Sequence, residues 1–173
     1  MKEYEKIILG IDPGTNILGY GLIGITKNRM ELISTGIVRM QKLENHQLKL
    51  KKIFESITHI IEEYLPDEVA VEAPFFGKNV QSMLKLGRAQ GVAMAATLVK
   101  DLPIVEYAPR KIKQSLTGKG SASKEQVAQM IKNLLKLSSL PKELDASDGI
   151  AVAICHYYQK NHKQEKTYSG WDA

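Results

Sequence analysis

The sequence has 173 residues, enough for one domain with a sizeable core. Its hydrophobic content of 43% and charged content of 25% are ordinary for a soluble globular protein, and no apolar run approaches the roughly 20 residues of a membrane span. The formal charge of +5 is mild, and the charged residues 1–6 lack the apolar core of a signal peptide, so we expect a cytoplasmic protein without a membrane partner.

The first predicted elements form an antiparallel meander. Apolar runs bounded by turn-forming residues predict buried strands, and the turns between the first three runs are short. Short turns require the strands to be antiparallel. Gly36 could interrupt the third strand. These predicted strands span residues 7–12, 18–26 and 30–38.

Helices and short strands alternate over the rest of the chain. Apolar residues recur at helical spacing from Leu50 to Tyr64, Phe54 among them, and Ser123 with Gln126 forms a capping box. Strands separated by helices should be parallel, so we predict an α/β fold with a mixed five-stranded sheet, an antiparallel meander plus parallel strands, covered by helices on both faces. The predicted helices span about 50–64, 79–100, 109–116, 123–135 and 143–160, and the predicted strands 68–72 and 104–107.

The helix over 79–100 is rich in small residues, which permit close backbone approach. It could pack on the sheet or against a second copy of the chain, and we expect packing on the sheet. Residues 1–160 are predicted to form one domain, followed by a polar, disordered tail over 161–173 in which Trp171 is unusual. The small residues are Gly87, Ala89, Gly91, Ala93, Ala95 and Ala96.

A single carboxylate, Asp12, ends the first apolar strand and is followed at once by Pro13 and Gly14. Burying an aspartate is costly unless its charge is compensated. Two interpretations compete: Asp12 is an Asx-type turn residue that bonds its own backbone, or it holds a cation. The second is favoured if partners exist elsewhere in the chain.

Three more acidic residues could be those partners. Glu72 closes the strand over 68–72, and ligands of open α/β sheets bind at the carboxyl ends of strands. Asp145 and Asp148 are three residues apart and therefore share one helix face. Helix capping would explain Asp145 well but Asp148 poorly.

Four converging carboxylates would repel one another unless a hard divalent cation were bound. Mg²⁺ prefers carboxylate, water and phosphate oxygens, and two such ions can activate a water and stabilise the leaving oxygen of a phosphodiester. From Pro109 to Lys124 there are five basic residues and no acidic one, which favours a polyanionic partner. The residues therefore indicate a metal-dependent phosphodiesterase.

The ordered motifs resemble one family over nearly the whole chain, from Ile7 to Tyr158: the RuvC family of bacterial Holliday-junction resolvases. The resemblance implies a ribonuclease-H-like fold and a homodimer that nicks symmetric strands of four-way junction DNA during recombination and repair. It also implies Mg²⁺, two ions per site, with Mn²⁺ as a substitute, and RuvA and RuvB as branch-migration partners. The motifs are residues 10–15, 71–72, 84–87, 106–108 and 145–148.

The resemblance also implies roles for individual residues. Asp12, Glu72, Asp145 and Asp148 stand at the catalytic, metal-binding positions. Lys113 and Lys124 match basic positions near the DNA backbone, and Phe75 matches an aromatic residue that stacks on a junction base. The DNA-binding positions are thus Phe75, Lys113 and Lys124.

Two departures from the family pattern stand out. Phe75 and Phe76 form a doubled aromatic, which leaves open the ring that faces DNA. Gly149 stands where the family commonly has alanine, and a glycine there is expected to loosen the helix by up to ~1 kcal/mol.

Two other functions compete with this interpretation. The Asp-x-Gly-Thr segment at residues 12–15 also occurs in the phosphate loops of actin-like and sugar-kinase-like ATPases, which need a second domain to close on nucleotide. A junction-binding module with relic carboxylates would bind without cleaving. His156 is expected to be structural, and Lys85 and Arg88 could contact the DNA backbone without reading its sequence.

Overall fold

A five-stranded sheet is the centre of the protein. The computed structural model describes residues 4–27, 29–75 and 77–163. The strand order across the sheet is β3-β2-β1-β4-β5, with β1, β2 and β3 antiparallel and β1, β4 and β5 parallel. The predicted mixed sheet is confirmed. The strands are β1 (Lys6–Asp12), β2 (Ile17–Thr26), β3 (Arg29–Arg39), β4 (Glu68–Glu72) and β5 (Ile104–Tyr107).

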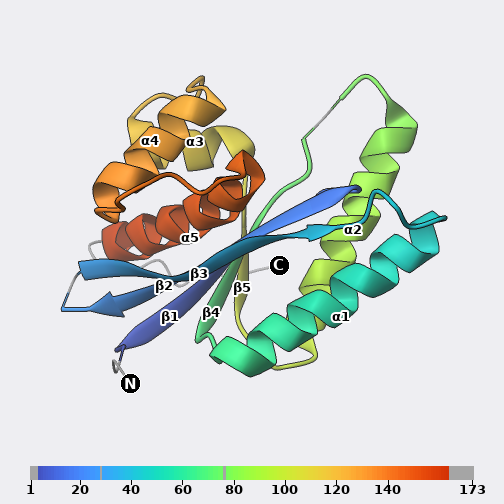
Figure 1. Ribbon diagram of the computed structural model, residues 1–173, viewed down its shortest axis with the longest axis horizontal. Coiled ribbons are helices and arrows are strands. Elements are labelled where there is room, and N and C mark those ends of the chain that lie inside the picture. Colours follow the sequence, from blue (N-terminus) through green and yellow to red (C-terminus); the bar gives the residue numbers. More distant parts are fainter. Residues whose placement is uncertain (1–3, 28, 76, 164–173) are drawn as a thin grey trace.

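Helices cover both faces of this sheet, as predicted (Figure 1). Two helices pack on one face, and the other face is covered by a long helix that carries two shorter ones on its outer side. None of the helices in the described ranges is long and apolar enough to cross a membrane. The helices are α1 (His46–Tyr64), α2 (Val80–Leu98), α3 (Pro109–Thr117), α4 (Lys124–Leu134) and α5 (Leu144–Lys163).

Alternation along the strands sends side chains to two separate cores. In β1, Leu9 and Ile11 pack with α1 and α2, while Ile8 packs with α5. In β4, Val69 and Val71 take the first side and Ala70 the second. Any residue of these strands that has the parity of Ile8 or Ala70 therefore faces α5.

Glycines let α5 lie directly on the strands. A Cβ atom built on Gly10 would lie 2.2 Å from the Gly149 carbonyl oxygen, and one built on Gly149 would lie 2.5 Å from backbone carbons of Tyr20. Neither distance is possible for a real side chain, so both backbones meet only because Cβ atoms are missing. α5 runs through Gly149 without interruption. Close packing against β2 therefore explains a glycine at position 149, although glycine has a low helix propensity.

Several predicted boundaries need correction. β3 is not broken at Gly36; the irregularity lies in the pairing between Leu22 and Ile23, opposite β3. Phe54 is exposed although it follows the apolar spacing of α1. α5 continues to Lys163, three residues beyond its predicted end. The predicted disorder of the tail concerns mainly residues 164–173, which with Trp171 lie outside the described residues.

The small residues of α2 divide between two sides of the helix. Ala89, Ala93 and Ala96 are buried against the α1 side of the sheet, which confirms that α2 packs on the sheet. Gly87 and Gly91 face open space, since a Cβ atom built on either meets no atom within 4 Å. Only half of the predicted small surface is therefore used within one chain.

Candidate active site

Asp12 and Glu72 end two neighbouring parallel strands. Both belong to the strand faces that point toward α5, because Asp12 has the parity of Ile8 and Glu72 has that of Ala70. The sequence argument required β1 and β4 to be adjacent and parallel, and they are. The two carboxylates therefore lie together at the carboxyl edge of the sheet.

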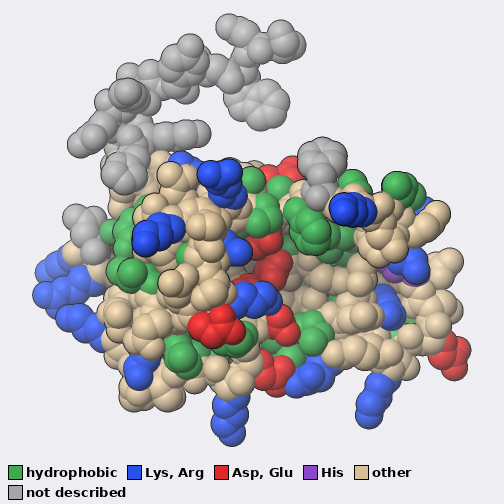
Figure 2. All heavy atoms as spheres, turned by 90° about the horizontal axis from the view of Figure 1, so that it is seen from above, with side chains coloured by type: hydrophobic (Ala, Val, Ile, Leu, Met, Phe, Trp, Pro, Cys, Tyr) green, Lys and Arg blue, Asp and Glu red, His purple; other side chains and the backbone are tan. Residues whose placement is uncertain are grey.

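α5 brings the remaining two carboxylates to the same place. Asp145 and Asp148 lie in its first turns, where the helix crosses β2 and β1. All four carboxylates line one cavity of about 500 Å³. Viewed from above, acidic side chains gather in the hollow between the two groups of helices, with Lys and Arg side chains around them (Figure 2). We call this cavity the carboxylate pocket.

Burial and mutual repulsion raise the pKa values of acids in the carboxylate pocket. Burial, followed by the charges of Glu72 and Asp148, raises the pKa of Asp12 well above its ordinary value. Burial and the charge of Asp148 raise the pKa of Glu72 to about 7. The pKa of Asp148 is also raised, chiefly by burial. The protein keeps these acids close together at an energetic cost, which is typical of functional sites.

Lys124 supplies a positive charge to the pocket. Its Nζ atom donates to Asp148 at 2.7 Å and to Asp145 at 3.2 Å. Burial alone would lower the pKa of Lys124, but the hydrogen bonds and charge of Asp148 raise it above its ordinary value. Lys113 also lines the pocket and lowers the pKa of Glu72 and Asp148 through its charge. The two predicted basic residues thus lie beside the carboxylates.

The predicted aromatic residue lies at the pocket as well. Phe75 is 61% exposed and lines the pocket wall, so its ring is available to a ligand. Phe76 lies outside the described residues. Sequence reasoning missed Gln90, which also lines the pocket and donates from Nε2 to Glu106 at 2.6 Å. A polar residue amid the small residues of a helix was the available signal.

The carboxylate oxygens suit a hard divalent cation in their chemistry. Among the described residues, no three Asp, Glu, His or Cys side chains converge closely enough to form a ready metal site. The ammonium group of Lys124 instead bridges Asp145 and Asp148, so these two acids already bind one positive charge. The raised pKa values of Asp12 and Glu72 show that further positive charge would be favourable there.

Comparison with known proteins agrees with this geometry. The family described as crossover junction endodeoxyribonuclease RuvC matches residues 8–156. The chain belongs to the RuvC family. The enzyme of that name from Cytophaga hutchinsonii is 58% identical over 171 residues, covering 99% of this chain and 85% of the relative. The one from Bacteroides fragilis is 59% identical over 170 residues, covering 96% and 90%.

Solved RuvC structures share the fold. Thermus thermophilus RuvC aligns with a TM-score of 0.80 at 29% identity, covering 90% of this chain and 96% of that one. The T. thermophilus RuvC structure in complex with a Holliday junction substrate gives 0.81 at 26% identity, with the same coverage. The predicted ribonuclease-H-like fold and the assignment to the crossover junction endodeoxyribonucleases are therefore confirmed. The ATPase alternative is set aside.

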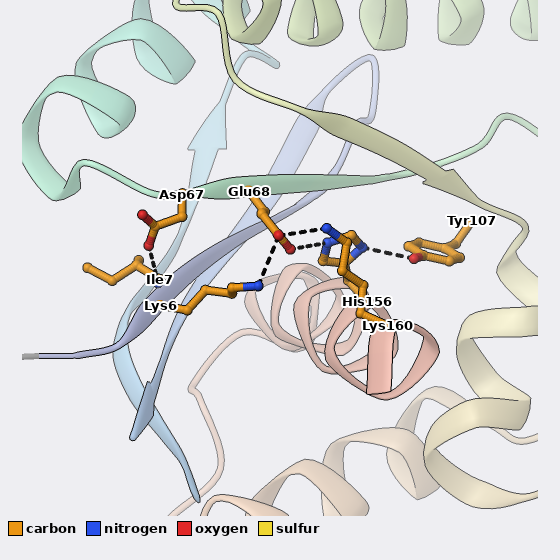
Figure 3. Close-up of polar contacts among 7 residues, drawn as sticks. All are labelled: Lys6, Ile7, Asp67, Glu68, Tyr107, His156 and Lys160. Atoms are coloured by element: carbon orange, nitrogen blue, oxygen red, sulfur yellow. Dashed lines mark hydrogen bonds and ion pairs between the residues drawn. The ribbon is translucent and has the colours of Figure 1, made fainter. Parts of the chain in front are cut away.

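A second polar cluster lies on the same face of the sheet (Figure 3). The sequence motifs of the RuvC family did not indicate it. Glu68, at the other end of β4, accepts from His156 Nε2 at 2.8 Å, and His156 Nδ1 lies 2.8 Å from the Tyr107 hydroxyl. Lys6 and Lys160 donate to Glu68 at 3.0 and 2.6 Å. His156 is 1% exposed and belongs to this cluster, not to the carboxylate pocket. The cluster ties β1, β4, β5 and α5 together.

The two ends of β4 are electrostatic opposites. Burial would raise the pKa of Glu68, but hydrogen bonds from Lys160, Lys6 and His156 lower it to about 2. Glu72, four residues later on the same face, has its pKa raised to about 7. The first carboxylate is paired with cationic groups of the protein, whereas the second is buried beside another acid.

The raised pKa of Glu72 predicts an unusual pH dependence of stability in the absence of divalent metal. Between its ordinary pKa of 4.5 and about 7 the folded protein binds more protons than the unfolded chain, so the free energy of unfolding should fall as pH rises through this window. The Glu72 contribution should be about 3 kcal/mol. Urea unfolding at pH 5 and pH 8 measures it. Glu72→Gln should lose the Glu72 part of this fall, while the raised pKa values of Asp12 and Asp148 keep a remainder, and an unchanged pH dependence in the variant would contradict the prediction.

Proposed function

We propose that the protein resolves four-way DNA junctions by paired, symmetric nicks and that Asp12, Glu72, Asp145 and Asp148 are its catalytic carboxylates. The observation that carries the proposal is the meeting of four carboxylates from three elements in one pocket of a RuvC family chain. The T. thermophilus relative binds a Holliday junction with the same fold. The four residues would hold Mg²⁺, with Mn²⁺ as a substitute and two ions per site.

The protein's own groups prepare the site for a phosphodiester. Bound Mg²⁺ supplies an activated water and stabilises the leaving oxygen. Positive charge from a bound metal would lower the raised pKa values of Asp12 and Glu72 and favour the ionised carboxylates that hold it. Lys124 pairs with Asp145 and Asp148, and it would contact the phosphate where these two acids hold a cation instead. Lys113 meets the phosphate from α3, and Phe75 stacks on a base at the pocket wall.

We also infer a homodimer, since symmetric nicking of a junction needs two active sites. The outer side of α2 supports it: Leu84, Gly91 and Leu98 are exposed there, and a Cβ atom built on Gly91 meets no atom. We also propose RuvA and RuvB as partners and a cytoplasmic location; family membership and the proposed DNA substrate support both. The predicted single nuclease domain over residues 1–160, of which residues 1–3, 28 and 76 lie outside the described residues, is part of the same proposal.

The decisive experiment compares a labelled four-way junction with a duplex of matched sequence, each incubated with the protein with and without Mg²⁺. We expect paired nicks in the junction alone, and only with the metal. If the protein binds the junction but does not nick it at any Mg²⁺ or Mn²⁺ concentration, it is a junction-binding module and not a nuclease. Nicking of both substrates would remove the structural selectivity.

Lys113→Ala should weaken junction binding without changing its sequence preference. A lost phosphate contact removes one released counterion, so the slope of log K against log salt should become shallower by about 1. Binding at a series of salt concentrations measures the slope. Lys132→Ala, on α4 away from the residues that line the pocket, is the control and should leave it unchanged. A wild-type slope in Lys113→Ala would exclude the phosphate contact.

A further inference from the structure

A second groove begins where the carboxylate pocket ends. It lies at the amino-terminal ends of α1 and α2 and has a volume of about 330 Å³. Most of its side chains are hydrogen-bond donors or cations, and Glu44 is its one acidic residue. We call it the outer groove. Its lining is Thr15, Asn16, Glu44, Asn45, His46, Lys49, Ser82 and Lys85.

Three cations act on one imidazole of the outer groove: Lys49 and Lys85 from its lining and Arg88 from α2. Burial, then the charges of Arg88, Lys85 and Lys49, lower the pKa of His46. Within the described ranges, none of these three cations forms a salt bridge with an acidic side chain, and the His46 Nε2 atom is buried without a hydrogen-bond partner. Positive charges from two helices therefore lie near one another, and in the described part of the chain no ion pair neutralises them, which favours anion binding.

The outer groove is continuous with the carboxylate pocket. Thr15 lines both, and it follows Asp12 by three residues in the turn between β1 and β2. Lys49 is held toward this turn because its Nζ atom donates to Asn16 Oδ1 at 2.7 Å. A DNA strand lying across Asp12 would therefore pass over Thr15 and then come close to Lys49 and Lys85.

We propose that the outer groove binds backbone phosphates of the DNA strand that leaves the carboxylate pocket past Thr15, with Lys49 and Lys85 as the principal contacts. The inference rests on the proposed function, because it takes the strand to be nicked as its ligand. Asn16 and Ser82 add neutral donors to the same phosphate backbone. The groove therefore contributes affinity and position without sequence preference.

Two variants test the contacts, in binding assays without divalent metal so that no nicking occurs. Lys49→Gln and Lys85→Gln should each weaken junction binding about tenfold at 0.1 M salt and make the salt slope shallower by about 1. Lys51→Gln is the matched control on α1, since Lys51 pairs with Glu55 and is 69% exposed. Junction affinities and slopes equal to those of Lys51→Gln would overturn the proposal.

A second measurement does not depend on the lysines. NMR signals of the His46 ring, assigned with His46→Gln, should shift when junction DNA is added, and the pKa of His46 should rise because a nearby phosphate favours the imidazolium. His46 signals that do not shift at saturating DNA would overturn the proposal that the outer groove binds DNA, whatever the result of the nicking assay. Shifted signals with no nicking under any divalent metal would support the groove and reject the nuclease.

Discussion

Asp12→Asn is expected to abolish junction nicking while sparing junction binding. Asp12 is the most central of the four carboxylates, since the charges of Glu72, Asp148 and Asp145 all raise its pKa. Asparagine keeps the shape but removes the charge that a divalent cation needs. Losing several kcal/mol of charge stabilisation lowers the nicking rate at least about a thousandfold. Single-turnover nicking of a labelled junction measures the rate, and electrophoretic binding without metal measures the affinity.

The same substitution should stabilise the metal-free fold. Burial and three like charges oppose the ionised form of Asp12, and a neutral amide escapes both. Asp101→Asn is the control, because Asp101 has a left-handed backbone (φ 55°) that asparagine also tolerates, and it lies outside the carboxylate pocket. Nicking that persists in Asp12→Asn would show that the metal-binding role belongs to another residue.

Glu68→Ala is expected to destabilise the fold by about 3 kcal/mol, the usual cost of removing one partner from a buried ionic cluster. Glu68 is 8% exposed, and its loss leaves the buried His156 Nε2 atom without its partner. Lys6 and Lys160 lose their shared acceptor as well. Urea unfolding at pH 7 measures the change in the free energy of unfolding.

Acid sensitivity gives this prediction a second readout. The pKa of Glu68 is lowered to about 2 from 4.5, so its stabilisation is complete above pH 4.5 and is lost as pH falls toward 2. The difference in the free energy of unfolding between the wild type and Glu68→Ala should therefore shrink at low pH. Glu55→Ala, an exposed partner of Lys51 on α1, should cost less than about 1 kcal/mol at any pH. Equal losses in the two variants would show that the Glu68 cluster is not a structural tie.

Local patterns in the sequence predicted the elements closely. β4 and β5 have the predicted bounds, and the capping box of Ser123 and Gln126 is present at the start of α4. These features depend on neighbours within a few residues, so the sequence displays them directly. The family motifs added the ribonuclease-H-like fold, which hydrophobic spacing alone left as an α/β class.

The carboxylate pocket was partly predictable for the same reason. Asp12 and Glu72 end apolar strands, and an acidic residue in that position stands out without knowledge of its partners. Asp145 and Asp148 share a helix face by spacing alone. Their meeting with Asp12 and Glu72 depended on one long-range fact, the parallel pairing of β1 with β4, which the sequence suggested only as a condition.

The sequence by itself determined the strands and helices, the four carboxylates and the family. Only the tertiary structure decided which charges surround Glu68 and Glu72, which begin and end the same strand on the same face. Glu68 meets Lys6, His156 and Lys160 from distant segments, whereas Glu72 meets other acids. The charge around a carboxylate is set by groups brought together across the fold, and no local pattern encodes them.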